Sequence, residues 1–128
     1  MTDTWEVPGA EGPREVRLTH PDKILWPDAG EGPVTKGDLA RYLLAVADPF
    51  LAINGNRPMT LQRFPDGIEG EEFFSKRPPR GAPSFLESVM CTYPSRRRHL
   101  QLVFDEPADL VWAAQMGTLT FHPWPVRV

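Results

Sequence analysis

Proline and glycine interrupt this chain so often that only short helices and strands can form between them. The sequence holds 15 prolines and 10 glycines among 128 residues. Proline cannot donate a backbone hydrogen bond and glycine favours turns, so both tend to end regular elements. Here they separate segments of regular hydrophobic periodicity and form neither a repeat nor a low-complexity tract. The sequence therefore predicts a mixed fold with many turns.

Two segments have the pattern of amphipathic helices. The first begins after Thr35, which is a good N-cap, and Asp38 stands where a capping box needs its acid. Apolar residues then recur at helical spacing, at Leu39, Tyr42, Leu43, Val46 and Phe50. Asp48-Pro49 is expected to end or kink this helix. The second helix begins at Glu106-Pro107 and stops at Gly117.

Six further segments have the alternation or the residue types of strands. They are residues 16–18, 57–64, 72–76, 88–93, 100–104 and 118–121. Turn residues 65–67 should join the second and third of these as an antiparallel pair. Phe73 and Phe74 are consecutive, so in a strand one can be buried while the other is exposed. We predict an α+β fold with a mostly antiparallel sheet and two main helices.

The first 16 residues differ in charge from the rest. They carry four acids and one base, a net charge of −3, which is also the net charge of the whole chain. The remaining residues are therefore neutral overall, although clustered bases can still bind a polyanion locally. We expect a flexible acidic arm over residues 1–16 and a single α+β domain over residues 17–128.

Several classes of protein and site lack their sequence signals here. No apolar run approaches the roughly 20 residues of a membrane span, and the polar, acidic start is unlike a signal peptide. A single cysteine, Cys91, excludes an internal disulfide and favours a cytoplasmic location. The sequence has no phosphate-binding loop, no dinucleotide fingerprint, no D-x-D pair and no metal-ligand spacing. We assign no catalytic residue and no metal site.

Two lysines bracket a loop rich in glycine and proline. Lys23 follows a turn, Lys36 lies at the predicted helix start, and residues 28–33 separate them. A turn and a helix start, each with a lysine and free backbone N–H groups, suit an oxyanion such as phosphate. Two ordinary surface lysines would fit the same spacing.

Basic and aromatic residues are interleaved along the middle of the chain. The basic ones are Arg63, Lys76, Arg77, Arg80, Arg96, Arg97 and Arg98, and the aromatic ones are Trp26, Phe64, Phe73, Phe74 and Trp124. Cations that neutralise phosphates, beside rings on which bases stack, are what single-strand or DNA-end binding requires. Core packing of the rings and a solvated hairpin tip for residues 96–98 are the alternatives.

Several separate motifs together resemble a known family. They are L-T-H-P-D-K-I-L-W-P from Leu18, T-K-G-D-L from Thr35, G-N-R-P-M-T-L-Q-R-F-P-D-G from Gly55, F-F-S-K from Phe73, and late L-V-W-A-A-Q and L-T-F-H-P-W. In this order they look like the N-terminal part of the polymerase domain of bacterial LigD-type DNA ligases. The resemblance implies a primase-like polymerase fold used in non-homologous end joining.

The resemblance implies roles for the lysines and the phenylalanine pair. Residues matching Lys23 and Lys36 hold the 5′-phosphate at a recessed DNA end, and His20 stands where the family usually has asparagine. Residues matching Phe73 and Phe74 stack on nucleic acid at the break.

Further roles follow from the same resemblance. Lys76 follows the phenylalanine pair in its expected place, and Arg63 matches a basic residue beside the template or nucleotide. Gln62 stands where a lysine is frequent, and His122 matches a histidine near the incoming nucleotide. We add Arg96, Arg97 and Arg98 as candidates for the DNA backbone.

The catalytic site that the resemblance implies is not in this sequence. The family holds Mg²⁺ or Mn²⁺ with a D-x-D pair and a third aspartate that follow the His-Pro-x-Trp region, and Val128 precedes all of them. We expect no cofactor here and no polymerisation by this chain alone.

The sequence thus predicts a catalytically incomplete piece of an end-joining polymerase that binds DNA ends. Its expected partners are gapped or recessed duplex DNA in the bacterial nucleoid, and a ligase or a catalytic polymerase half. One alternative is a protein-interaction or assembly module that self-associates through apolar surface around Trp124, Val126 and Val128. The other is one half of a split DNA or RNA polymerase.

Overall fold

The computed structural model describes residues 1–128, which form nine strands and three helices. The strands are β1 (Thr2–Val7), β2 (Arg14–Thr19), β3 (Ile24–Trp26), β4 (Val34–Thr35), β5 (Pro58–Arg63), β6 (Phe73–Ser75), β7 (Glu87–Thr92), β8 (Arg98–Val103) and β9 (Thr118–Pro123). The helices are α1 (Lys36–Ala45), α2 (Ala47–Asn54) and α3 (Pro107–Gln115). Every strand pair is antiparallel, so the predicted α+β class is confirmed.

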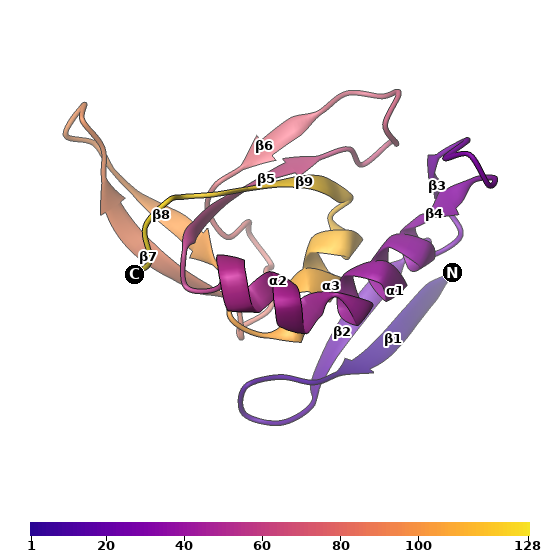
Figure 1. The fold of residues 1–128 in the computed structure, drawn as a ribbon, viewed down its shortest axis with the longest axis horizontal. Coiled ribbons are helices and arrows are strands. Elements are labelled where there is room, and N and C mark those ends of the chain that lie inside the picture. Colours follow the sequence, from indigo (N-terminus) through magenta and orange to yellow (C-terminus); the bar gives the residue numbers. More distant parts are fainter.

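The main sheet is built around β5. On one side β5 pairs with β9 along nearly its whole length. On the other side it pairs with β6 through residues 61–63 and with β8 through Pro58 and Met59. β7 pairs with β8 as the predicted hairpin, and Figure 1 shows that hairpin projecting away from the helices. The predicted antiparallel pairing of β5 with β6 is confirmed.

α3 is the centre of the hydrophobic core. All seven of its residues from Ala108 to Ala114 are buried, and it contacts α1, α2, β1, β2 and β9. Met59 and Leu61 of β5 and Leu102 of β8 join the same core, so the helices cover one face of the main sheet. Figure 1 shows α1 and α2 running across α3, with the β1–β2 pair beside it. The opposite face of the sheet has no helix over it.

The first residues form a strand pair where the sequence suggested a flexible arm. Every residue of β1 pairs with β2, from Thr2 opposite Thr19 to Val7 opposite Arg14. The alternation of Trp5 and Val7 with polar residues gives β1 an apolar side, and Val7 is fully buried. Burial of that side stabilises the strand despite its acidic composition. We correct the predicted arm to a β-hairpin.

The predicted start of the first helix is confirmed. The Asp38 amide donates to Thr35 Oγ1 at 3.1 Å, and the Thr35 amide donates to Asp38 Oδ2 at 3.0 Å. This is a capping box. The helix breaks at Val46, and Pro49 then lies in the first turn of α2, where a missing N–H costs little. Tyr42 was predicted on the apolar stripe but is 63% exposed.

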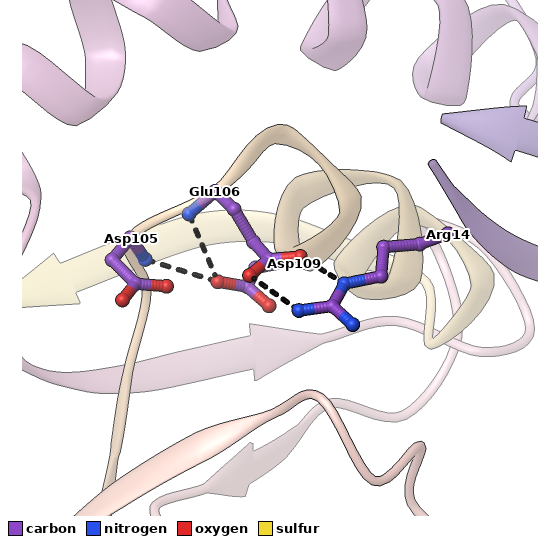
Figure 2. Close-up of polar contacts among 4 residues, drawn as sticks. All are labelled: Arg14, Asp105, Glu106 and Asp109. Carbon is purple, nitrogen blue, oxygen red and sulfur yellow. Dashed lines mark hydrogen bonds and ion pairs between the residues drawn. The ribbon is translucent and has the colours of Figure 1, made fainter. Parts of the chain in front are cut away.

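A second capping box begins α3, and it is buried. Asp109 Oδ2 accepts from the amides of Asp105 at 2.9 Å and Glu106 at 3.2 Å (Figure 2). The Arg14 guanidinium donates to both oxygens of Glu106, with the shorter contact at 2.8 Å. Burial raises the pKa of Asp109 to about 8, although the two backbone hydrogen bonds act in the other direction.

Two arginines from outside α2 donate hydrogen bonds to the carbonyls at its C-terminal end. Arg57 Nε donates to the Ile53 carbonyl at 2.9 Å. Arg127 donates to the carbonyls of Ala52, Ile53 and Gly55 at 3.1–3.3 Å. Cationic donors at a helix C-terminus satisfy its last carbonyls and complement its dipole. None of the three helices is long and apolar enough to cross a membrane.

Candidate nucleic-acid interface

Lys23 and Lys36 lie side by side, in a region that we call the lysine corner. Lys23 directly precedes β3, Lys36 is the first residue of α1, and β3 pairs with β4 just before the helix. The Lys36 amide donates to the Lys23 carbonyl at 2.8 Å. The short β3–β4 pair therefore brings together two lysines that the sequence separates by a loop.

Lys36 is a buried cation without a carboxylate partner. Its side chain is 8% exposed, and Nζ donates to the Thr19 carbonyl at 2.8 Å. Burial lowers the pKa of Lys36, and the positive charge of Lys23 lowers it further. A cation in the first turn of a helix also opposes the helix dipole. The surroundings of Lys36 thus disfavour its charge in three ways.

Lys23 is half-exposed and has an acidic partner that sequence reasoning did not identify. Its Nζ lies 3.2 Å from Asp66 Oδ1. Asp66 belongs to the turn between β5 and β6, 43 residues along the chain. The sequence marks that turn but carries no signal that it reaches the lysine corner.

The backbone amides of the lysine corner are not free, so that part of the prediction is wrong. At the start of α1, Lys36 donates to the Lys23 carbonyl and Gly37 donates to the Pro21 carbonyl, both at 2.8 Å. Asp38 donates to Thr35, as described above. In the preceding turn, the Lys23 amide donates to the His20 carbonyl at 3.0 Å. An anion at this corner would meet the ammonium groups and not the helix amides.

His20, the third residue predicted at this corner, is exposed. It has a positive φ of 50°, and its amide donates to the Met1 carbonyl at 2.8 Å. His20 and Lys23 line one cavity of about 410 Å³ together with Met1, Pro21 and Asp22. The structure thus brings His20 and Lys23 to the same opening, and their role there stays a prediction.

Phe73 and Phe74 are both exposed, by 46% and 57%. The sequence suggested that one of them could be core. β6 is only three residues long and pairs with β5 alone, and neither ring is covered by the rest of the chain. Both rings are therefore available for contact with another molecule.

Phe74 and His122 meet on the sheet face that has no helix over it, which we call the open face. Phe74 lies opposite Gln62 on β5, and His122 of β9 lies opposite Thr60. The two rings have centroids 6.2 Å apart. His122 Nε2 lies 2.9 Å from Gln62 Oε1, and Gln62 Nε2 donates to Glu72 Oε2 at 2.6 Å.

Arg63 lies away from the open face. Side chains alternate along β5, and Arg63 is opposite Phe73, on the other face from Gln62. Its Nε donates to the Met116 carbonyl at 3.0 Å and one terminal nitrogen donates to Ser75 Oγ at 3.3 Å. Burial lowers the pKa of Arg63. The structure thus gives Arg63 partners within the fold, and its predicted contact with nucleic acid stays a prediction.

The basic hairpin tip is confirmed as an exposed feature. Arg96 and Arg97 lie in the connection between β7 and β8, Arg98 is the first residue of β8, and all three are exposed. Figure 1 places this hairpin and the β3–β4 pair at opposite ends of the molecule, so the chain has two separate basic regions. The Lys76 carbonyl accepts from the Leu102 amide of β8 at 2.7 Å, and Lys76 Nζ lies 5.5 Å from the centre of the ring of Tyr93, the residue after β7.

No group of three or more His, Cys, Asp or Glu side chains that could hold a metal ion is present. The features that hold the predicted nucleic-acid contacts are the two basic regions and the open face. Sequence reasoning named residues of all three, but it missed Asp66, Glu72 and Tyr93, which contact the named residues.

Comparisons with known proteins identify the family of this chain. The family model of the LigD primase-polymerase domain matches residues 35–128. The multifunctional non-homologous end joining protein LigD of Mycolicibacterium smegmatis is 35% identical over 114 residues, which are 89% of this chain and 14% of that protein. The protein of the same name from Pseudomonas aeruginosa is 36% identical over 110 residues, 85% of this chain and 12% of that protein.

A solved structure shares the fold. The polymerase domain of Mycobacterium tuberculosis ligase D, solved in complex with DNA, matches with a TM-score of 0.80 and 32% identity. The match covers 88% of this chain and 38% of that domain. The chain therefore spans a small part of the relatives' length and less than half of the solved domain. On this match of motifs, family model and fold, the chain belongs to the LigD primase-polymerase domain family.

Proposed function

We propose that this chain binds DNA ends in double-strand-break repair by non-homologous end joining, and that the lysine corner receives a 5′-phosphate. The relatives are named as end-joining proteins, and the solved neighbour is a polymerase domain in complex with DNA. Its place of action would then be the bacterial nucleoid.

The observation that carries this proposal is the buried charge of Lys36. Charged groups inside proteins are normally paired, because removal from water is costly. Lys36 has only the Thr19 carbonyl as a hydrogen-bond partner, and the like charge of Lys23 lowers its pKa further after burial. A terminal phosphate carries up to two negative charges, and it would supply the counter-charge that Lys36 lacks and add one to Lys23.

The open face and the hairpin would hold the rest of the nucleic acid. Phe73 and Phe74 offer exposed rings on which bases can stack, at about 1–3 kcal/mol per base in comparable proteins. Lys76 and residues 96–98 supply exposed cations for the phosphate backbone. His20 and His122 are proposed to contact the 5′-phosphate and the nucleotide, respectively.

We propose further that this chain binds without polymerising. The family's metal ligands include a D-x-D pair, and these 128 residues contain none. Primer extension with Mn²⁺ tests this point directly, and nucleotide incorporation by the isolated chain would contradict it.

The decisive experiment compares recessed duplexes with and without a 5′-phosphate. We expect the wild-type chain to prefer the phosphorylated end by about tenfold, which corresponds to one strong charge-assisted contact. The Lys23→Ala/Lys36→Ala variant should lose this preference. A matched control, Arg96→Ala/Arg97→Ala, removes two exposed charges at the opposite end of the molecule and should keep it. Equal affinity of the wild type for both duplexes would exclude the phosphate site.

Salt dependence gives a second test of the same proposal. Affinity should fall steeply as salt rises, because each neutralised phosphate releases counterions. Substitution of Arg96, Arg97 and Arg98 by alanine should make the affinity less dependent on salt. The preference for the 5′-phosphate should stay the same. An unchanged dependence of affinity on salt would show that the hairpin does not contact the DNA backbone.

An assembly module is the second candidate, favoured by exposed apolar residues near the end of α2. Ile53, Val126 and Val128 are 65%, 58% and 70% exposed, and Arg127 ties the last residues to the Ile53 carbonyl. This patch could pair with a second copy, a ligase or a polymerase half. Sedimentation distinguishes the candidates, because a dimer that is indifferent to DNA would favour the module.

A further inference from the structure

We infer that Glu72, acting through Gln62, fixes His122 in the tautomer that carries its hydrogen on Nε2, so that the open face presents Nδ1 as a hydrogen-bond acceptor. Glu72 and Gln62 are then positioning residues for His122. The tautomer itself follows from the contacts in the free protein, whereas its use in binding rests on the proposed function.

Three strands hold these side chains in place. Gln62 lies in β5 between Phe74 of β6 and Thr120 of β9, so its backbone is paired on both sides. His122 lies further along β9 on the same face, and its ring packs near Phe74 with 6.2 Å between centroids. Glu72 directly precedes β6. The chain of contacts from Glu72 to His122 therefore spans neighbouring strands at fixed register.

The direction of the hydrogen bonds follows from the acid at one end. An ionised carboxylate can only accept, so Glu72 Oε2 must receive a hydrogen from the Gln62 amide nitrogen, 2.6 Å away. That orients the amide and turns Oε1 toward His122. An amide oxygen can only accept as well, so His122 Nε2, 2.9 Å away, must carry the hydrogen. In a neutral imidazole, Nδ1 is then the acceptor.

The consequence for binding concerns the kind of group that meets His122. At a pH where the ring is neutral, Nδ1 can accept but cannot donate. A phosphate oxygen cannot supply the hydrogen, whereas a base amino group or a sugar hydroxyl can. His122 would thus contact a base or a sugar of the strand that stacks on Phe74, and not its phosphate.

The test reads the tautomer by two-bond ¹H–¹⁵N NMR on the intact chain at pH 8.5. The wild type should show the Nε2–H form. Glu72→Gln keeps the size but lets the end group donate or accept, so both tautomers should appear. Glu72→Lys can only donate, which reverses the Gln62 amide and should give the Nδ1–H form. Glu71→Gln, a change in the adjacent exposed acid, is the matched control and should leave the wild-type spectrum.

Two results would overturn the inference. One is an Nδ1–H form in the wild type, and the other is an unchanged tautomer in Glu72→Lys. All of these variants lie on the exposed surface, so folding should survive in each, and the amide spectrum verifies it. The experiment needs no DNA, so failure of the proposed function would leave its outcome intact.

A titration with two oligonucleotides tests which chemical group of the nucleic acid contacts His122. An eight-residue oligo(dA) presents base amino groups, and an abasic strand of the same length presents only sugar and phosphate. We expect oligo(dA) to shift the Nδ1 resonance of His122. A shift with oligo(dA) alone assigns the contact to the base, whereas a shift with both strands, or saturated binding with no Nδ1 shift, would contradict this part of the inference.

Discussion

The starts of α1 and α3 share a capping box but treat their buried charges in opposite ways. At α3, Glu106 is 4% exposed and forms an ion pair with Arg14. At α1, Lys36 is similarly buried, but the charge beside it is Lys23. Burial of a paired charge is common in structural sites, whereas a buried cation beside a second cation at a helix N-terminus gains little for stability. The buried charge at α3 thus has its partner within the fold, whereas the one at α1 would gain a partner only from the proposed phosphate.

The two capping acids show the same contrast. The pKa of Asp38 is lowered, first by the hydrogen bond from the Thr35 amide and then by Arg41, because this cap is near the surface. Asp109 makes the same kind of backbone bonds, yet burial raises its pKa to about 8. One local motif can thus either favour or disfavour ionisation, and its depth in the protein decides which.

The substitution with the largest expected effect on stability breaks the paired charge at α3. Glu106→Ala removes the cap and both hydrogen bonds from Arg14, and should lower the free energy of unfolding by about 2 kcal/mol. Urea denaturation measures it, with Glu15→Ala on the exposed side of β2 as the control. A loss below about 0.5 kcal/mol would mean that α3 does not depend on this ion pair, and the contrast with α1 would weaken.

The next prediction is that the free energy of unfolding depends on pH because Asp109 titrates. Its folded pKa of about 8 is above the ordinary value of 3.8, so between these pH values the folded state binds more protons than the unfolded state. Stability should therefore fall as pH rises from 5 to 8, by up to about 1.4 kcal/mol per pH unit. The Glu87 carboxyl, whose pKa is also raised, first by the charge of Asp105, acts in the same direction.

Asp109→Asn sharpens this prediction. The amide oxygen can still accept the hydrogen bonds from Asp105 and Glu106, but it no longer titrates. The decline in stability between pH 5 and pH 8 should become clearly shallower than in the wild type. Identical pH profiles would show that Asp109 does not titrate in this range.

A smaller effect is expected when the unpaired cation at α1 is removed. Lys36→Met keeps the length of the side chain, leaves the Thr19 carbonyl without its donor, and relieves the repulsion from Lys23. These changes oppose each other, so the free energy of unfolding should stay the same or rise by up to about 1 kcal/mol. Preference for a 5′-phosphate should be lost. A clear loss of stability would instead assign Lys36 to the fold.

The smallest effect on stability concerns Asp66. Its pair with Lys23 is exposed, so Asp66→Asn should change the free energy of unfolding by less than about 0.5 kcal/mol. It frees Lys23, however, and affinity for the phosphorylated duplex should increase. Titration of both duplexes measures this, and lower affinity would indicate that Asp66 holds Lys23 in its binding position.

Local motifs were predictable from sequence because their partners are near in the chain. The capping box of Thr35 and Asp38, the hairpin of β7 and β8, and the turn after β5 each depend on a few consecutive residues. The strand β1 was missed because acidic residues and Gly-Pro content masked the alternation of Trp5 and Val7.

Side-chain contacts between residues far apart in the chain could not be predicted from the sequence. The ion pair of Arg14 and Glu106 spans 92 residues, and the contact of Lys23 with Asp66 spans 43. Neither spacing has a local periodicity that could reveal it. The exposure of both Phe73 and Phe74 likewise depends on the absence of a layer over β6.

The arginine contacts at the end of α2 have a consequence for how the molecule opens. Arg127 holds three carbonyls of residues 52–55, and the Val128 amide donates to the Asn56 carbonyl at 2.6 Å. The last turn of α2 and the segment after β9 therefore cannot fray independently, since release of either leaves the other's polar groups to water. Thermal opening at this corner should be a single cooperative event that joins residues more than 70 positions apart.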